Sequence, residues 1–142
     1  MSMELHMAIV KIYHAQKNRT RPGMIEIGLS PGQPKVLVYV SQHNHCMQKD
    51  VAEALNIEPA TVSQILKNME QSGLVSRSNH LERKRAESIS ITEKGMDYYE
   101  KWVLLCSKLD KEALNGFSKD EADRLLEYLC RLYVNMTGKP ME

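Results

Sequence analysis

The chain has 142 residues and a mass of 16.3 kDa, of which 42% are hydrophobic, 26% charged and 6% aromatic. This is enough apolar sequence for one domain with one core, and it argues against both intrinsic disorder and an aromatic-rich β fold. The formal net charge is only +1, so bulk charge gives no support to nucleic-acid binding, and any such function must depend on where the basic residues lie.

Targeting and membrane signals are weak throughout the sequence. The longest apolar run, Val36–Val40, falls far short of the roughly 20 residues that span a bilayer. The N-terminal segment carries Glu4 and His6 and has no apolar signal core. The three cysteines are odd in number and far apart, which does not suggest a disulfide framework. We therefore expect a cytoplasmic protein with no membrane contact.

The N-terminal segment predicts one helix. Apolar residues that include Leu5, Ile9 and Tyr13 recur at helical spacing and predict a helix that ends near Asn18. The prolines and glycines between residues 22 and 34 indicate a joint between helices rather than a flexible interdomain linker.

A second helix is predicted after this joint. Ser30 precedes Pro31, which is a plausible N-cap followed by proline at the first helical position. The β-branched residues within 36–40 favour a strand by local propensity, but the proline start and the context favour a helix that ends near His43.

Two short helices are predicted next, with the spacing of a helix-turn-helix. Ala52 is small where two helices would cross, and Asn56 tolerates the positive φ that the turn needs. Val62 follows six residues later as a β-branched plug between the helices. These intervals match a helix-turn-helix whose first residue is Gln48.

The second of these helices, from Pro59 to about Gly73, divides into an apolar and a polar side. The residues predicted to face the core are Val62, Ile65, Leu66 and Met69. Those predicted to face outward are Thr61, Ser63, Gln64 and Lys67. Such short donors, acceptors and a cation suit base edges and phosphates in a major groove, although a solvated helix face would show the same pattern.

A β-hairpin is predicted after Gly73. Ile89 and Ile91 alternate with serines, which is the pattern of a half-buried strand. The segment from residue 77 to 85 holds four basic residues and one acid, Glu82, and so has a local charge of +3. Its basic residues are Arg77, Arg83, Lys84 and Arg85. A cationic tip beside a polar helix suits contacts with the minor groove and with phosphates, and the alternative is an ordinary solvated turn.

Two further helices are predicted in the C-terminal part. Thr92 is expected to cap a long helix, and Ser118 with Glu121 forms the pattern of a capping box that opens the last one. The apolar stripe of the last helix consists of Leu125, Leu126, Leu129, Leu132, Tyr133 and Met136. A helix this apolar on one side leaves an exposed patch unless another surface covers it.

From Gln48 to Gly95 the sequence resembles the MarR family of regulators. The segments that carry the resemblance are 48–52, 60–63, 69–75 and 91–95. Helix order and length extend it over nearly the whole chain. It implies a mainly helical fold with a small β-hairpin wing: one domain in which residues 31–95 form a winged helix-turn-helix and residues 1–30 and 96–142 form dimerisation helices.

The resemblance also implies a function. The chain would be a homodimeric transcription regulator on a pseudo-palindromic operator in double-stranded DNA, a repressor released by a small-molecule ligand. It would need no cofactor, and the sequence shows no glycine-rich phosphate loop or nucleophile elbow that would indicate an enzyme. The expected DNA-binding residues are Gln48, Lys49, Thr61, Ser63, Gln64, Lys67, Arg77, Arg83, Lys84 and Arg85.

One departure and two alternatives remain open at this point. Members of the family usually have an aspartate in the wing where this chain has Arg83, so either Glu82 takes the role of that aspartate or the wing is looser. The near-neutral charge and the altered wing leave open a dimeric protein-interaction adaptor that does not bind DNA. Another alternative is a thiol- or metal-sensing regulator that acts through Cys46, the cysteine expected to be exposed, while Cys106 and Cys130 lie on apolar stripes and are expected to be core residues.

Overall fold

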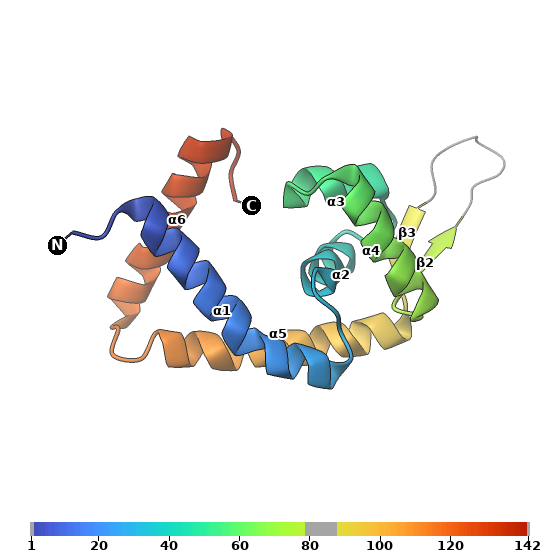
Figure 1. The fold of residues 1–142 in the computed structure, drawn as a ribbon, viewed down its shortest axis with the longest axis horizontal. Coiled ribbons are helices and arrows are strands. Elements are labelled where there is room, and N and C mark those ends of the chain that lie inside the picture. The colour runs from blue at the N-terminus through green and yellow to red at the C-terminus, as the bar shows by residue number, and fades with distance from the viewer. Residues whose placement is uncertain (1, 79–87, 142) are drawn as a thin grey trace. The chain divides into compact units, whose positions relative to one another are not determined.

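A computed structural model of the chain describes residues 2–78 and 88–141. The described elements, in chain order, are α1 (Leu5–Ile27), α2 (Gln33–Gln42), β1 (Cys46–Met47), α3 (Gln48–Leu55), α4 (Pro59–Gln71), β2 (Val75–Ser78), β3 (Ser88–Ile91), α5 (Glu93–Ala113) and α6 (Lys119–Thr137) (Figure 1). The chain divides into two compact units, Met1–Cys106 and Ser107–Glu142. The predicted mainly helical fold with a small antiparallel sheet is confirmed. Among the described residues, no helix combines the length and hydrophobicity needed to cross a bilayer.

The first helix is longer than its sequence predicts. α1 continues past Asn18 and through Pro22 and Gly23, and it ends at Gly28, which has φ 105°. The expected joint at Pro22-Gly23 is therefore wrong. Tertiary packing overrides the local signal, because Gly23 lies against Leu105 of α5 so closely that a Cβ would come within 2.5 Å of the leucine.

The start of α2 also differs from the prediction. Helical structure begins at Gln33 rather than Pro31, and the N-cap is Gly32 with φ 86°. Ser30 instead forms a turn with Gln33: the Gln33 N–H donates to the Ser30 carbonyl, and the Ser30 N–H donates to Gln33 Oε1, each at 3.0 Å. Pro34 is the proline that lies in the first helical turn. The prediction of a helix over residues 36–40 is confirmed.

A third strand accompanies the predicted hairpin. β1 pairs with β3, which also pairs with β2, so the antiparallel order is β1-β3-β2. Cys46 and Arg77 lie on either side of Ile89 in this register. The sequence does not predict β1, since two residues are too short to show a strand pattern.

The core of the first unit lies among α2, α3, α4 and the sheet, with α2 in contact with α3, α4 and β3 (Figure 1). Its fully buried side chains are Val36, Leu37, Val40, Val51, Val62, Leu66, Met69, Leu74 and Ile89. Val75 of β2 is also buried, so helices and sheet of the winged helix-turn-helix share one core. Hydrophobic burial of this kind holds the two helices of the motif at a fixed angle.

The beginning of α5 is joined to the end of α4 by a set of short contacts. The Thr92 hydroxyl donates to the Gly73 carbonyl at 2.6 Å and accepts from the Gly95 N–H at 2.9 Å, which confirms Thr92 as the cap of α5. Lys94 Nζ donates to the Ser72 carbonyl at 2.8 Å. Gly95 is buried, and a Cβ there would lie 2.1 Å from the carbonyl oxygen of Leu74.

The second unit contains the end of α5 and α6. The predicted capping box is confirmed, because the Ser118 N–H donates to Glu121 Oε1 at 2.9 Å and the Glu121 N–H donates to Ser118 Oγ at 3.1 Å. Hydrogen bonds from the backbone N–H and the side chain of Ser118 to its carboxylate lower the pKa of Glu121. No residue of α6 is fully buried: in its apolar stripe Leu132 and Tyr133 are half-buried, and Leu125, Leu126, Leu129 and Met136 are exposed.

Candidate nucleic-acid interface

The turn between α3 and α4 has the geometry that its sequence predicts. Asn56 ends α3 in the left-handed conformation, with φ 53° and ψ 46°. The Ile57 N–H donates to the Ala52 carbonyl at 3.1 Å, which closes the turn. Ala52 is buried where the two helices meet, and Val62 is fully buried between them. The structure thus confirms the predicted helix-turn-helix.

The helix α4 is divided as expected. Val62, Leu66 and Met69 are 0% exposed, and Ile65 is half-buried. The four residues of the predicted outward face are all exposed, namely Thr61, Ser63, Gln64 and Lys67. Gln64 Nε2 donates to Asn68 Oδ1 at 3.0 Å on this face. One side of α4 is therefore fixed in the core while the other presents donors, acceptors and a cation to solvent.

The first turn of α3 supplies the next two predicted residues. Lys49 is exposed and Gln48 is half-buried. The carboxylate of Asp50 accepts from the Met47 N–H at 3.0 Å and satisfies one of the free donors at the helix start. Lys49 is thus available to an anion, whereas Gln48 is already engaged inside the protein.

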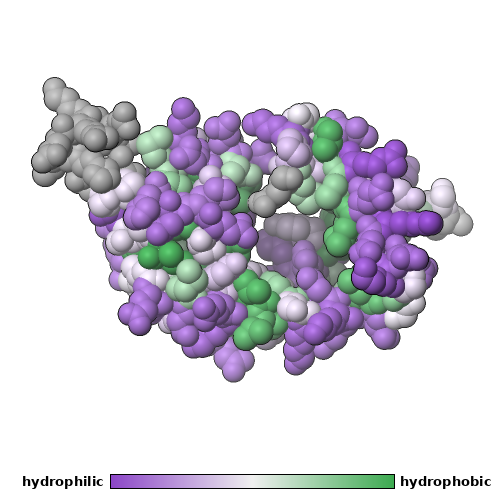
Figure 2. Space-filling view, turned by 180° about the vertical axis from the view of Figure 1, so that it is seen from behind, coloured by the Kyte–Doolittle hydropathy of each residue, from purple (hydrophilic) through white to green (hydrophobic). Residues whose placement is uncertain are grey.

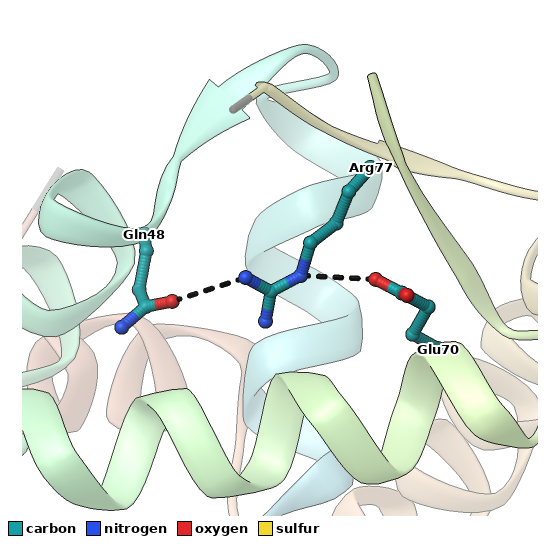
Figure 3. A network of polar contacts seen from close by, with 3 residues as sticks. All are labelled: Gln48, Glu70 and Arg77. Carbon is teal, nitrogen blue, oxygen red and sulfur yellow. Dashed lines mark hydrogen bonds and ion pairs between the residues drawn. The ribbon is translucent and has the colours of Figure 1, made fainter. Parts of the chain in front are cut away.

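Gln48 belongs to a polar network centred on Arg77, which extends from β2 between α3 and α4 (Figure 3). Arg77 Nε donates to Glu70 Oε2 at 3.0 Å, and its Nη1 donates to Gln48 Oε1 at 3.4 Å. The side chain of Arg77 is 22% exposed. The sequence singled out Arg77 and Gln48 but not Glu70. The signal that could have found it is its position on the outward face of α4, three residues after Lys67 and just before the wing.

The tip of the wing falls outside the described residues. Arg83, Lys84, Arg85 and the neighbouring Glu82 all belong to the segment 79–87. At the base of the wing, β2 and β3 are joined by a 2.7 Å hydrogen bond between the hydroxyls of Ser78 and Ser88. The described strands therefore place Ser78 and Ser88 side by side at the base of the hairpin.

The expectations for the cysteines are corrected. Cys46 is buried, with 8% of the residue exposed, because β1 packs it against the core. Desolvation raises the pKa of its thiol, and the Asp50 carboxylate raises it further. Cys130 is exposed and Cys106 is half-buried. A sensor thiol at Cys46 is thus contradicted, since a reactive cysteine needs access and a low pKa.

The histidines beside Cys46 take part in local structure. His45 Nδ1 lies 2.8 Å from the Ser90 hydroxyl, and the ring of His43 stacks on Tyr39 with centroids 4.2 Å apart. Within residues 2–78 and 88–141, no three His, Cys, Asp or Glu side chains are arranged to hold a metal ion.

The fixed helix pair, its exposed polar face and the adjacent hairpin define a winged helix-turn-helix protein. A sequence profile of the MarR family matches residues 29–86. The chain is 28% identical over 111 residues to the HTH-type transcriptional regulator YdgJ of Bacillus subtilis, covering 78% of this chain and 68% of that protein.

Solved structures agree with this class. The transcriptional regulator SlyA superposes with a TM-score of 0.87 at 27% identity, covering 94% of each chain. A putative MarR family regulator from Listeria monocytogenes, complexed with 26mer DNA, superposes with a TM-score of 0.87 at 24% identity, covering 95% of this chain and 90% of that one. The chain is thus similar to MarR-type transcriptional regulators, in sequence over residues 29–86 and in fold over nearly its whole length.

Proposed function

We propose that the chain is a homodimeric, sequence-specific DNA-binding regulator that represses nearby genes and is released from its operator by a small-molecule ligand. The observation that carries the proposal is the division of α4. Val62, Leu66 and Met69 are fully buried, so the helix is held rigidly. Thr61, Ser63 and Lys67 extend into solvent on the other side. A rigid helix with a polar outer face is what major-groove recognition requires.

The positive charges near this helix support binding to the DNA backbone. Lys49 and Lys67 are both exposed, and neither forms an ion pair with another described residue. We assign phosphate or minor-groove contacts to Arg83, Lys84 and Arg85 as well. Because these contacts are local, a net charge near zero does not oppose the proposal.

The proposed dimer is supported by the hydrophobic side chains that the single chain leaves in solvent. In α1 they are Leu5, Met7, Ile9, Val10, Ile12 and Tyr13. In α6 they are Leu125, Leu126, Tyr128, Leu129, Val134 and Met136. Figure 2 shows hydrophobic residues at the surface between the hydrophilic ones on one face of the molecule. Symmetric association with a second copy would cover both helices and give two recognition helices per molecule.

The proposed mechanism of release is geometric. A dimer reads both halves of its operator only if its two recognition helices lie about 34 Å apart, which is one turn of the duplex. A ligand lodged between the dimerisation helices and the winged region would favour another spacing and so weaken DNA binding. In the first unit, an open hollow of about 310 Å³ lies between α1 and α5, within the proposed dimerisation helices. It is lined by Gly23, Glu26, Ile27, Lys101 and Leu105.

DNA binding is tested by titrating the chain against a duplex from its own upstream region. We expect salt-sensitive binding that weakens in Lys67→Ala and Arg85→Ala, with the slope of log K against log salt falling by about 0.9 for each phosphate that a variant no longer neutralises. Lys108→Ala is the control, because it removes the same charge outside the helix-turn-helix and the wing. No binding by the wild type at about 50 mM salt would reject the proposal in favour of a protein-interaction adaptor.

The dimer is tested by light scattering. We expect a mass of twice 16.3 kDa for the wild type and of one chain for Leu129→Asp, which places a charge on the apolar stripe of α6. Lys35→Ala changes the net charge by the same amount at an exposed position of α2, outside the proposed dimerisation helices, and should remain dimeric. A wild type of monomer size would contradict the proposal.

Release is tested by adding aromatic carboxylates to the DNA complex, one at a time.

A further inference from the structure

We infer that Arg77 is a positioning residue that ties the base of the wing to the recognition helix, rather than a contact to the DNA. The inference rests on the proposed function, since it concerns how α4 is held for DNA binding. Arg77 and Gln48 are then not among the residues that contact DNA. They orient the recognition helix α4.

The strand register directs Arg77 inward. In β2, Val75 and Arg77 lie on the same face because side chains alternate along a strand. Val75 is 2% exposed, and the cross-strand partner of Arg77 is Ile89, which is 1% exposed. Ser76 and Ser78 lie on the opposite face and are exposed. Arg77 thus extends from the core side of the sheet.

The guanidinium joins three elements that are distant in sequence. It donates to Glu70 in the last turn of α4 and to Gln48 in the first turn of α3, from its own position in β2 (Figure 3). The planar fork of an arginine can hold two acceptors at once in a fixed geometry. Both helices of the motif are therefore linked to the wing through one side chain.

The position at the end of α4 adds an electrostatic reason. The last turn of α4 contains no basic residue of its own, although cations are favoured at helix C-termini. Lys94 brings one positive charge to this end through its bond to the Ser72 carbonyl, and Arg77 adds a second through its ion pair with Glu70. The same pair offsets the charge of Arg77, so this residue has less to contribute to phosphate binding than Lys67, which is exposed and forms no ion pair within the described part of the chain.

The test compares Arg77→Met, Glu70→Ala and their double variant with the wild type on the same upstream duplex and on a random-sequence duplex. Methionine keeps the unbranched stem of Arg77 without the guanidinium. Lys67→Ala serves as the benchmark for a direct phosphate contact. Glu58→Ala is the control for removing an acid from the other end of the same helix. Circular dichroism and Tm verify that each variant is folded. If Arg77→Met does not fold, Arg77→Lys and Glu70→Ala carry the test.

We expect Arg77→Met to weaken binding to the upstream duplex by about tenfold while the salt slope stays at the wild-type value. Glu70→Ala should also weaken binding to the upstream duplex, although it removes a negative charge near the DNA. The double variant should bind no more weakly than Arg77→Met alone. Arg77→Lys should restore binding only in part. Lys67→Ala should lower the salt slope by about 0.9 per contact, hence by about 1.8 for a symmetric dimer.

Three results would overturn the inference. A salt slope in Arg77→Met that falls as in Lys67→Ala, or tighter binding in Glu70→Ala, would make Arg77 a phosphate contact. Unchanged affinity for DNA with a lower Tm in both Arg77→Met and Glu70→Ala would show that Arg77 contributes to stability alone. In these cases the wild type still binds and the proposed function stands. Absence of wild-type binding to both duplexes overturns the proposed function itself, and this inference with it.

Discussion

The helices α4 and α6 have similar sequence patterns but differ in how deeply their apolar stripes are buried. Each has an apolar stripe with polar residues on the other side. In α4 the stripe is buried, with Leu66 and Met69 at 0% exposure. In α6 no residue is buried, and Leu129 and Met136 remain 41% and 74% exposed.

This difference shows that amphipathicity specifies a buried face without specifying what buries it. α4 finds its partner inside the chain, in α3 and the sheet. Most of the stripe of α6 stays exposed, and the proposed second copy would cover it. The following predictions test this contrast in order of decreasing effect.

The largest effect is expected from truncating matched leucines in the two helices. Leu66→Ala should lower the free energy of unfolding by about 2–5 kcal/mol, because it leaves a cavity in a fully packed core. It should not promote dissociation of the dimer. Leu129→Ala should instead raise the dissociation constant of the dimer, measured by light scattering on dilution. The contrast fails if Leu129→Ala lowers stability without changing association.

The next effect is expected at the boundary of the packed region. In Gly95→Ala the new Cβ would meet the backbone oxygen of Leu74 and the side chain of Ile91, which should cost about 1–3 kcal/mol in denaturant unfolding. Because this contact joins α5 to the segment that connects α4 with β2, affinity for DNA should fall as well. In Gly116→Ala nothing lies within 4 Å of the new Cβ, so only the positive φ is unfavourable and DNA affinity should not change.

A smaller effect is expected at the start of α6. Ser118→Ala removes the hydroxyl that accepts from the Glu121 N–H and should lower Tm by roughly 4 °C. The backbone hydrogen bond from Ser118 lowers the pKa of Glu121 in the folded state. A lowered pKa stabilises the fold above the unfolded pKa, and this stabilisation is lost as the pH falls through the folded value.

The difference in Tm between the wild type and Glu121→Gln should therefore be present at pH 7 and shrink below about pH 4. A difference that stayed constant from pH 7 to pH 3 would exclude the carboxylate as its source.

The last prediction concerns the rate of cysteine alkylation, which reports how deeply each thiol is buried and should have the smallest effect on stability. At pH 7.5, iodoacetamide should alkylate Cys130 at least about tenfold faster than Cys46, because burial raises the thiol pKa of Cys46 and limits access. Peptide mass spectrometry gives both rates in one sample. Equal rates would contradict the packing of β1 against the core.

Features that depend on a few neighbouring residues were predictable. Asn56 in the left-handed turn, the capping box at Ser118 and the divided faces of α4 are all predicted from the sequence and are all observed. Their physical basis is local, since a backbone conformation or a cap is decided within one or two helical turns. The predicted DNA contacts on α4 are exposed as expected, and their role stays a prediction.

Residue spacing and caps, which act over a few residues, were sufficient to specify the helix-turn-helix, the hairpin and the amphipathic stripes. They were not sufficient to show that α1 continues through Gly23 against Leu105, that Cys46 is buried in a third strand, or that Arg77 faces Glu70 and Gln48. Each of these features depends on a partner from a distant part of the chain, and local patterns do not say which distant segments meet in the folded protein.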